Sequence, residues 1–585
     1  MTARCPATHL LACALLILAP TLYGEITLPG ILASNMVLQR DQPVPVWGWG
    51  DPGEIVTISY GGQTARATTR GDRIWEATLP PMPFNARGRS LTIQGTNKIV
   101  LRNVLVGEVW ICSGQSNMEW RISQSMNAQA EAAAADFPLI RIFDVPGRHV
   151  SPVPERTVPG GTWQPCTSES IRNFSAVGYH FGRRIHKELK VPVGLIGSNW
   201  GGTRIEPWIP PAGLLSVAEL AAIAERTATY TPDTKLGGGD PAAIYNAMVH
   251  PLTPFALRGA IWYQGESNGA EGRSYYHKKH ALVNGWRTAF RNDQLAFYWV
   301  QLANFRQPNP DPAGGDGWAR IREAQTQALD IPHTGMAVIT DIGAANDIHP
   351  RNKQDVGKRL AQWALHQTYG RKDLVPSGPL YKGFKIEGGT IRVSFDHVGS
   401  GLMVGRKEGL RPVEEVKDAK LQHFAVADAD MNWHWANATI DGDTILLRSD
   451  KVPRPEAVRY AFSMNPRTAN LYNREGLPAS PFRTDTWRGP TEELIWHPLT
   501  EGTPPSSVPG AGSEISFTNK RKESVHIYWM AYGGGTKRYA TLQPGETHTQ
   551  TTFSKAYWLI TDTREVPLGY FMSTEKIGIA VIPEQ

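Results

Sequence analysis

The pattern of apolar and polar positions divides the chain into regions of different secondary structure. Residues 25–103 contain short apolar runs, such as 44–50 and 55–60, which are separated by turn residues. Short strands at this spacing predict a β-sandwich domain. Residues 104–373 instead alternate apolar runs of strand length with stretches in which apolar residues recur every three or four positions. Such alternation predicts a doubly wound parallel sheet that is covered by helices on both faces.

The same periods place the expected elements along the chain. Strands are expected at 104–112, 193–198, 259–263, 297–301 and 336–340, and helices at 121–135, 171–189, 275–290, 319–329 and 353–366. Residues 374–490 return to a β pattern. Residues 491–512 are predicted to be a linker, because 502–512 are dense in Pro, Gly and Ser. Residues 513–585 predict a last β module. The predicted fold class is therefore α/β, with all-β domains on either side of the parallel sheet.

The N-terminus has the pattern of a signal peptide. Arg4 precedes an apolar run at 10–19, which is too short to span a bilayer and is typical of the apolar core of an export signal. We therefore expect residues 1–24 to be removed, the mature protein to be secreted or periplasmic, and no segment to cross a membrane. Cys112 and Cys166 then remain. Either they form a disulfide in an oxidising compartment, or Cys112 fills the end of a buried strand as a small apolar residue.

Composition and motifs exclude several classes of function. The chain has 60 basic and 54 acidic residues among 585, and no basic stripe with interleaved aromatic residues, so nucleic-acid binding has no support. There is no HExxH or paired-cysteine spacing for a metal, and no GxGxxG or P-loop pattern after a strand. The sequence predicts neither a bound metal nor a cofactor.

Polar residues follow the predicted strands at three places. Residues 114–117 follow the strand at 104–112, residues 264–268 follow the strand at 259–263, and residues 347–350 lie just before the helix at 353–366. The carboxyl ends of parallel strands meet at one edge of a sheet, where open α/β folds bind their ligands. Acyl transfer needs a hydroxyl nucleophile, an imidazole base, a group that orients the imidazole, and donors for the oxyanion. These parts are supplied in turn by Ser116, His349, Asp347 and Gln264.

Each of these residues also has an interpretation without catalysis. Ser116 is then a structural serine in a strand-to-helix turn, and His349 is a loop residue before a proline. Gln264 and Glu266 are then partners of backbone groups in a turn. The joint occurrence of Ser, Gln and His at three strand ends favours catalysis over an inactive core that only binds glycans or peptides.

Residues 25–487 resemble the bacterial sialate O-acetylesterases, which belong to the SGNH/GDSL hydrolase superfamily. The resemblance rests on the motifs CSGQSNM at 112–118, SNWGGT at 198–203, WYQGESN at 262–268 and NDIHPRNKQ at 346–354. The run NLYNREGLPASPFR at 470–483 adds support. The resemblance implies an SGNH-type fold and a serine esterase that needs no cofactor.

The same resemblance implies roles for the site residues. Ser116 is expected to be the nucleophile and His349 the general base. The implied oxyanion hole is formed by the backbone N–H groups of Ser116 and of Gly201 or Gly202, together with the side chain of Gln264.

The carboxylate that orients His349 does not stand at the position usual in the superfamily. Many SGNH hydrolases carry it three residues before the histidine, where this chain has Asn346. The neighbouring Asp347 is the expected orienting carboxylate, and a Ser–His dyad is the alternative. Glu266 is expected to be a structural partner within the loop of Gln264.

The implied reaction is the removal of O-acetyl groups from sialic acids or acetylated glycans through an acyl-enzyme on Ser116. An esterase for acetylated xylan or another polysaccharide is the alternative, because the residues of the site act on the acetyl group and not on the sugar. A non-catalytic protein that binds glycans or peptides is the alternative from another class.

Residues 513–585 resemble the β domain of the von Hippel-Lindau tumour suppressor, on the motifs IYWMAY at 527–532, YATLQPGET at 539–547 and AYWLI at 556–560. In that family the sandwich binds a hydroxyproline-bearing peptide, and the matching pocket positions here are Trp529, Tyr539, Thr552, Ala556 and Trp558. The family has Ser at the position of Thr552 and His at the position of Ala556. The module is therefore either a peptide-binding domain or an accessory sandwich without a ligand.

Overall fold

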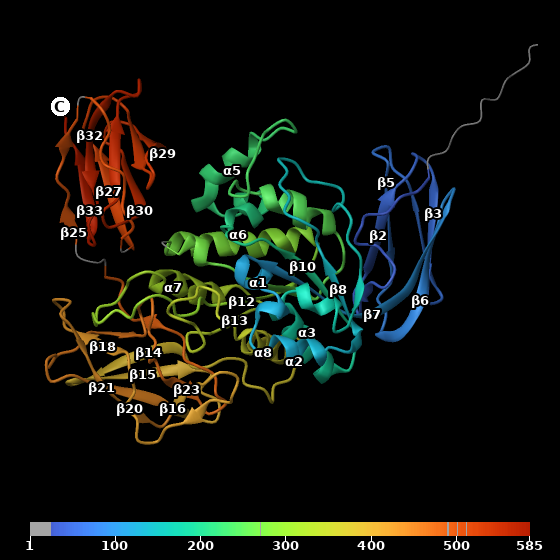
Figure 1. Ribbon diagram of the computed structural model, residues 1–585, viewed down its shortest axis with the longest axis horizontal. Helices are drawn as coiled ribbons and strands as arrows, with labels where there is room; N and C mark the ends of the chain where they lie inside the picture. The colour runs from blue at the N-terminus through green and yellow to red at the C-terminus, as the bar shows by residue number, and fades with distance from the viewer. Residues whose placement is uncertain (1–24, 270, 488–490, 500, 511, 585) are drawn as a thin grey trace, which may run out of the picture.

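The computed structural model describes residues 25–269, 271–487, 491–499, 501–510 and 512–584 (Figure 1). The expected signal peptide at 1–24 lies outside the described residues. Figure 1 shows a central α/β unit between N-terminal β strands on the right and C-terminal β regions on the left. Within the described ranges, no helix is long and apolar enough to cross a bilayer.

The central sheet has the strand order β13-β12-β11-β7-β10-β8-β9. Its strands are β7 Lys98–Gly114, β8 Phe137–Asp144, β9 Gln164–Cys166, β10 Val193–Asn199, β11 Gly259–Tyr263, β12 Ala296–Val300 and β13 Thr334–Ala337. All neighbours pair in parallel except β9, which is antiparallel to β8. The fold is therefore mixed α/β with a largely parallel central sheet.

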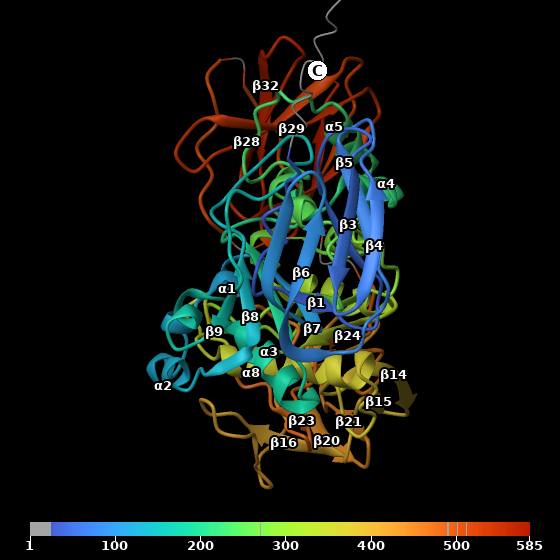
Figure 2. The same ribbon diagram turned by 90° about the vertical axis from the view of Figure 1, so that its right-hand side faces the viewer.

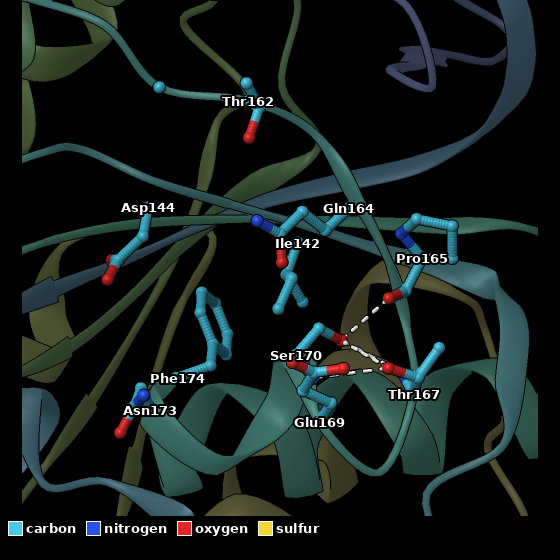
Figure 3. A pocket seen from close by; sticks show the side chains of 11 residues that line it. Ile142, Asp144, Thr162, Gln164, Pro165, Thr167, Glu169, Ser170, Asn173 and Phe174 are labelled. Atoms are coloured by element: carbon cyan, nitrogen blue, oxygen red, sulfur yellow. Dashed lines mark hydrogen bonds between the residues drawn. The ribbon is translucent and has the colours of Figure 1, made fainter.

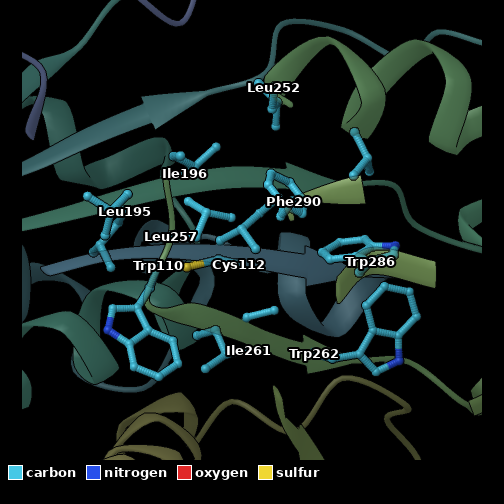
Figure 4. Close-up of a cluster of buried hydrophobic side chains, with 14 of the residues drawn as sticks. Trp110, Cys112, Leu195, Ile196, Leu252, Leu257, Ile261, Trp262, Trp286 and Phe290 are labelled. Carbon is cyan, nitrogen blue, oxygen red and sulfur yellow. The ribbon is translucent and has the colours of Figure 1, made fainter. Parts of the chain in front are cut away.

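Helices cover both faces of this sheet because its strands are apolar on both sides. On one face, the Trp110 ring meets Phe181 of α3 Ala176–Leu189 at a centroid distance of 4.9 Å. On the other face, the Trp262 ring meets Trp286 of α6 Arg273–Ala289 at 6.1 Å. Further helices are α4 Pro211–Leu215, α5 Ala221–Ala228, α7 Ala319–Gln327 and α8 Lys353–Trp363. Figure 4 shows the core on which these layers pack.

Cys112 and Cys166 are both buried and free, so the structure supports the interpretation of Cys112 as a small apolar residue at the end of a buried strand. Its sulfur lies beside Gly178 of α3, at 2.9 Å from where a Cβ at that glycine would stand. Cys166 ends β9 at the edge of the sheet. Burial raises the pKa of both thiols, that of Cys166 to about 12. Both side chains therefore act as small core residues.

The expected helix at 121–135 is replaced by shorter pieces. They are α1 Ser116–Glu119, a 3-10 turn at Ile122–Gln124 and α2 Ala128–Ala133. The Trp120 carbonyl accepts the backbone N–H of Ala176, and Asn127 has a left-handed φ of 55°. The bond to Ala176 and the left-handed backbone at Asn127 therefore interrupt the helix that the apolar period predicts.

The N-terminal β region and the central sheet share β7. Residues 98–107 of this strand pair with β6 Asn85–Gln94 and β1 Val37–Gln39, whereas 108–114 pair with β10 and β11. The domain boundary expected between residues 103 and 104 thus falls inside one strand. The region also contains β2 Val44–Trp49, β3 Ile55–Tyr60, β4 Gln63–Thr68 and β5 Ile74–Leu79. In Figure 2 these strands lie toward the viewer, in front of the central sheet.

The region after α8 forms separate small sheets. They contain β14 Leu380–Glu387, β15 Thr390–Asp396, β16 Leu402–Arg406, β17 Glu414–Glu415, β18 Phe424–Ala427, β19 Trp433–Trp435, β20 Asn437–Asp441, β21 Thr444–Arg448, β22 Ala457–Tyr460, β23 Leu471–Asn473 and β24 Phe482–Arg483. The fully buried Arg322 of α7 joins this region to the central unit. Its guanidinium donates at 2.6–2.9 Å to the carbonyls of Leu302, Ala303, Ser463 and Met464.

The C-terminal module consists of two sheets. Its strands are β27 Gly512–Asn519, β28 Val525–Met530, β29 Thr536–Leu542, β30 Thr547–Phe553, β31 Tyr557–Thr561, β32 Pro567–Met572 and β33 Ile577–Ile582. Part of the expected linker 491–512 also belongs to it, since β25 Thr491–Glu493 pairs with β33 and β26 His497–Pro498 pairs with β32. These two short strands join the module because the apolar side chains of Leu494 and Trp496 pack against its core.

Candidate active site

Ser116 stands at the carboxyl end of β7, on a turn that requires glycine. Gly114 has a φ of 135°, and a Cβ there would lie 2.2 Å from the Tyr263 carbonyl oxygen. The chain then turns at Gln115, and Ser116 is the first residue of α1. The serine is thus held at the edge of the sheet between β10 and β11.

The structure brings His349 to this serine from 233 positions away in the sequence. Its Nε2 lies 2.9 Å from Ser116 Oγ. The imidazole stacks on the Trp120 ring at a centroid distance of 4.5 Å and an angle of 13°. Burial and the charge of Lys353 lower the pKa of His349, while the charge of Asp347 opposes them. A neutral imidazole near pH 7 can accept a proton, as a general base must.

Asp347 lies near His349 but does not bond its ring. Asp347 Oδ1 is 3.8 Å from His349 Nδ1, which is beyond hydrogen-bond distance. The same oxygen instead accepts the backbone N–H of His349 at 2.9 Å. The carboxylate therefore fixes the loop and acts on the imidazole only through its charge.

Gly201 lies beside Ser116, where a donor to an oxyanion is expected. A Cβ at Gly201 would stand 3.1 Å from Ser116 Cβ. Gly202 has a left-handed φ of 79° and open space at its Cβ position. The Gly201 N–H, however, donates to Glu119 Oε2 at 2.7 Å.

Gln264 differs from the sequence prediction. Its side chain is fully buried, and its amide nitrogen donates to the Thr203 carbonyl at 3.2 Å and to Asn268 Oδ1 at 2.7 Å. Its Oε1 accepts the Tyr275 hydroxyl at 2.9 Å. Both N–H groups are thus used within the loops, and in this arrangement the side chain joins loops instead of facing an oxyanion.

A buried charge cluster holds the same loops. Lys278 Nζ lies 2.8 Å from Glu206 Oε1 and 2.6 Å from Glu271 Oε2, and Arg204 also pairs with both carboxylates. Although burial opposes it, the charges of Lys278 and Arg204 lower the pKa of Glu206 to about 2. Glu206 therefore stays ionised at neutral pH, and its ion pairs keep the loops of Gly201 and Gln264 together.

A second network, which sequence reasoning missed, joins the residue after Ser116 to the loop of His349. The Asn117 amide donates to Glu266 Oε1 at 2.6 Å and to the Ile348 carbonyl at 3.0 Å. The fully buried Lys353 donates to Asn117 Oδ1. Burial lowers the pKa of Lys353 to about 7, against the charges of Glu266 and Asp347, and burial raises the pKa of Glu266. Glu266 is thus a structural partner, as expected from its position beside Gln264.

Glu119 and Arg148 form an ion pair beside this site that the sequence did not reveal. Arg148 Nη2 lies 2.9 and 3.2 Å from the two Glu119 carboxylate oxygens. The only signal in the sequence is that Glu119 lies three positions after Ser116, on the same face of a helical turn.

A cavity of about 680 Å³ lies elsewhere on the central unit. It is bounded by β8, β9 and the turn before α3, and Figure 3 shows its polar side chains, among them Asp144, Gln164 and Asn173. Neither Ser116 nor His349 is among the described residues that line it. Within the described residues, no group of His, Cys, Asp or Glu side chains is arranged to hold a metal ion.

The pocket positions of the C-terminal module also gather, but with little open polar surface. The Trp558 indole donates to Thr552 Oγ1 at 3.0 Å, and both side chains are buried, as is Ala556. The Tyr539 ring lies 5.2 Å from that of Trp558. Trp529 stands opposite Trp558 on the adjacent strand. The Thr552 hydroxyl and the Trp558 indole thus hydrogen-bond each other inside the module.

Comparison with known proteins decides the family. Residues 106–366 match the family model described as carbohydrate esterase, sialic acid-specific acetylesterase. Human sialate O-acetylesterase is 31% identical over 380 residues, which are 59% of this chain and 72% of the human protein. The chain belongs to the sialate O-acetylesterase family.

Two further proteins are similar to a larger part of this chain. Mouse sialate O-acetylesterase is 30% identical over 513 residues, covering 76% of this chain and 92% of the mouse protein. A crystal structure of a carbohydrate acetylesterase from Xanthomonas citri is 40% identical, with a TM-score of 0.70, and covers 79% of this chain and all of that one. These findings confirm the resemblance to sialate O-acetylesterases and the prediction of a carboxylic ester hydrolase.

Proposed function

We propose that this chain hydrolyses O-acetyl esters of sialic acids through an acyl-enzyme on Ser116. The observation that carries the proposal is the 2.9 Å contact of Ser116 Oγ with His349 Nε2, in a member of the sialate O-acetylesterase family. Serine hydroxyls become nucleophiles when a neighbouring imidazole takes their proton. The lowered pKa of His349 keeps the imidazole ready for that step near neutral pH.

In the proposed first half-reaction, Ser116 Oγ attacks the acetyl carbonyl carbon while His349 Nε2 takes the hydroxyl proton. The negative charge on the carbonyl oxygen is met by the backbone N–H of Ser116 and by those of Gly201 or Gly202. Collapse of the intermediate breaks the ester bond, and His349 returns its proton to the sugar hydroxyl. No step draws on a metal or a cofactor.

In the second half-reaction, His349 takes a proton from water, and the hydroxide formed attacks the acetyl group on Ser116. The tetrahedral intermediate collapses with cleavage of its bond to Ser116 Oγ, which takes the proton back from His349. Acetic acid leaves and ionises to acetate. Asp347 stabilises the imidazolium through its charge at 3.8 Å, so the machinery is a Ser–His pair supported by a carboxylate, without a hydrogen-bonded triad.

A second candidate function is the deacetylation of another carbohydrate, such as acetylated xylan. It is favoured by the 40% identity to the carbohydrate acetylesterase from Xanthomonas citri. The residues described above would act on the acetyl group and not on the sugar, so they would serve either substrate. A purely binding protein is disfavoured by the intact Ser–His pair.

We also propose the finer features expected from the sequence. The order of the four motifs supports an SGNH-type core of bacterial origin, and the apolar run near the N-terminus supports export to the periplasm or beyond. The motifs at 527–560 support a von Hippel-Lindau-like module. A peptide ligand is the least supported feature, because Thr552 and Trp558 are buried against each other.

The test is acetate release from O-acetylated sialic acid and from acetylated xylan, measured in parallel for the natural protein and for Ser116→Ala. We expect release from the sialic acid and a loss of at least about a thousandfold in the variant, with an unchanged melting temperature. Ser216→Ala, an exposed serine at the end of α4, is the matched control and should behave as the natural protein.

Each other outcome is informative. Release from xylan alone would keep the mechanism and replace the substrate. Turnover that persists in Ser116→Ala would overturn the mechanism. Release from neither sugar, with no labelling of Ser116 by a fluorophosphonate, would favour a binding protein.

A further inference from the structure

The ion pair of Glu119 and Arg148 occupies a backbone group that the proposed reaction needs. Glu119 Oε2 accepts the Gly201 N–H at 2.7 Å, and Gly201 lies against Ser116. Arg148 binds the same carboxylate at 2.9 Å. In this arrangement an acetyl oxygen could not use the Gly201 N–H, because Glu119 already holds it.

The Glu119 carboxylate at the Gly201 N–H is electrostatically unfavourable for an oxyanion that forms beside Gly201. A tetrahedral oxyanion beside Gly201 would stand within a few ångströms of the Glu119 carboxylate, and like charges at that distance repel. Glu119 must therefore withdraw, or its charge must be compensated, when the oxyanion forms. Arg148 supplies the compensation only while it stays bound to Glu119.

Arg148 has the properties of a carboxylate-binding group. Its side chain is 53% exposed, and its guanidinium stands 6.0 Å above the Trp200 ring, which limits its freedom. Guanidinium suits carboxylates in charge and in geometry. The Glu119 carboxylate shows that this place, next to Ser116, accepts such a group.

We propose that Arg148 binds the carboxylate of an acidic acetylated sugar, and that Glu119 holds its place in the free enzyme. When the substrate carboxylate takes Arg148, Glu119 turns away and releases the Gly201 N–H to the oxyanion. A neutral sugar cannot make this exchange and reacts only when Glu119 opens unaided. The inference rests on the proposed function and makes Arg148 the residue that selects acidic sugars over neutral ones.

The experiment compares three substrates: O-acetylated sialic acid, the same sugar with its carboxyl converted to a primary amide, and 4-nitrophenyl acetate. The variants are Arg148→Gln, Glu119→Gln and the double variant, with Arg156→Gln, an exposed arginine of the same loop region, as control. Glutamine keeps the size of Glu119 and its ability to accept the Gly201 N–H, so removal of charge is the main change.

We expect the natural protein and the control to prefer the acid to the amide. The double variant should raise KM for the acid by about ten- to a hundredfold, the effect of one charged hydrogen bond, and should lose the preference. Its hydrolysis of 4-nitrophenyl acetate should stay within about twofold of that of Glu119→Gln, because Arg148 is proposed to contact only the sugar carboxylate, which this ester lacks. Glu119→Gln should keep the preference and hydrolyse the neutral ester faster, because the repelling charge is gone.

Other results would overturn the inference. An acid preference that survives in the double variant would show that Arg148 does not bind the substrate. Loss of 4-nitrophenyl acetate hydrolysis with an unchanged melting temperature would place the pair in the catalytic machinery instead. If the double variant fails to fold, Arg148→Lys decides: it keeps the charge without the fork, and an unchanged KM for the acid would refute the assignment. Failure of the natural protein on both sugars, with the aryl ester still hydrolysed, would count against the proposed substrate and is thus distinguishable.

Discussion

Replacing Asp347 by asparagine would measure what the carboxylate beside His349 contributes to catalysis. The charge–charge attraction at the observed 3.8 Å is about 1 kcal/mol in water and about 4 kcal/mol at an effective dielectric constant of 20. Because the Asp347 side chain is 41% exposed, solvent screens the pair toward the lower value. We expect about 1 to 2 kcal/mol of lost transition-state stabilisation, which is about a 5- to 30-fold lower kcat/KM.

The substitution is well matched to the question. Asparagine keeps the oxygen that accepts the His349 backbone N–H at 2.9 Å, so the loop should hold its shape. Asp347→Ala removes this bond as well and should cost more. The assay is kcat/KM on 4-nitrophenyl acetate and on the acetylated sugar, with the melting temperature as a check on folding. A loss near about 10⁴-fold in Asp347→Asn, as for the acid of a hydrogen-bonded serine triad, would refute the reasoning and show that the carboxylate closes onto Nδ1 during the reaction.

Two further predictions concern buried cations. Lys353→Met removes a positive charge that lowers the pKa of His349, so the acid limb of the kcat/KM–pH profile, which reports protonation of the base, should move to higher pH; a shift to lower pH would contradict this. Arg322→Met leaves four carbonyls at the junction with the β14–β24 region without their donor. Urea unfolding should show a loss of roughly 3–5 kcal/mol, against little change for Arg320→Met on the same helix, and an unchanged stability would show that water replaces the guanidinium.

Strands of the central sheet were predictable where their apolar character is continuous. The expected strand at 259–263 coincides with β11, because a strand buried on both faces needs apolar residues at every position. β8 was missed because Pro138 and Arg141 interrupt its pattern. Arg141 is tolerated there because it donates to Asn35, which is 106 positions away and gives no local signal.

The candidate site likewise has features that the sequence predicts and features that it does not. Ser116 and His349 could be proposed from their places at strand ends, and the structure puts them in contact. The sequence could not show that the Gln264 amide turns into its own loop, since that depends on Thr203 and Asn268 being close to it. Nor could it show that Lys353 reaches Asn117, 236 positions earlier. Side-chain direction depends on tertiary neighbours, which spacing does not encode.

The continuity of β7 joins the N-terminal region rigidly to the central sheet. One strand carries the hydrogen bonds of the N-terminal sheet on residues 98–107 and those of the central sheet on 108–114, and Ser116 follows two residues after its end. The N-terminal region is therefore not connected to the central sheet by a flexible linker. A protein shortened to begin at residue 104 would lose β1 and β6, and would leave residues 104–107 of β7, the part that leads into the central sheet, as an open strand edge. Residues of the N-terminal sheet therefore help to fix the strand that leads to Ser116, although they lie at the opposite end of that strand.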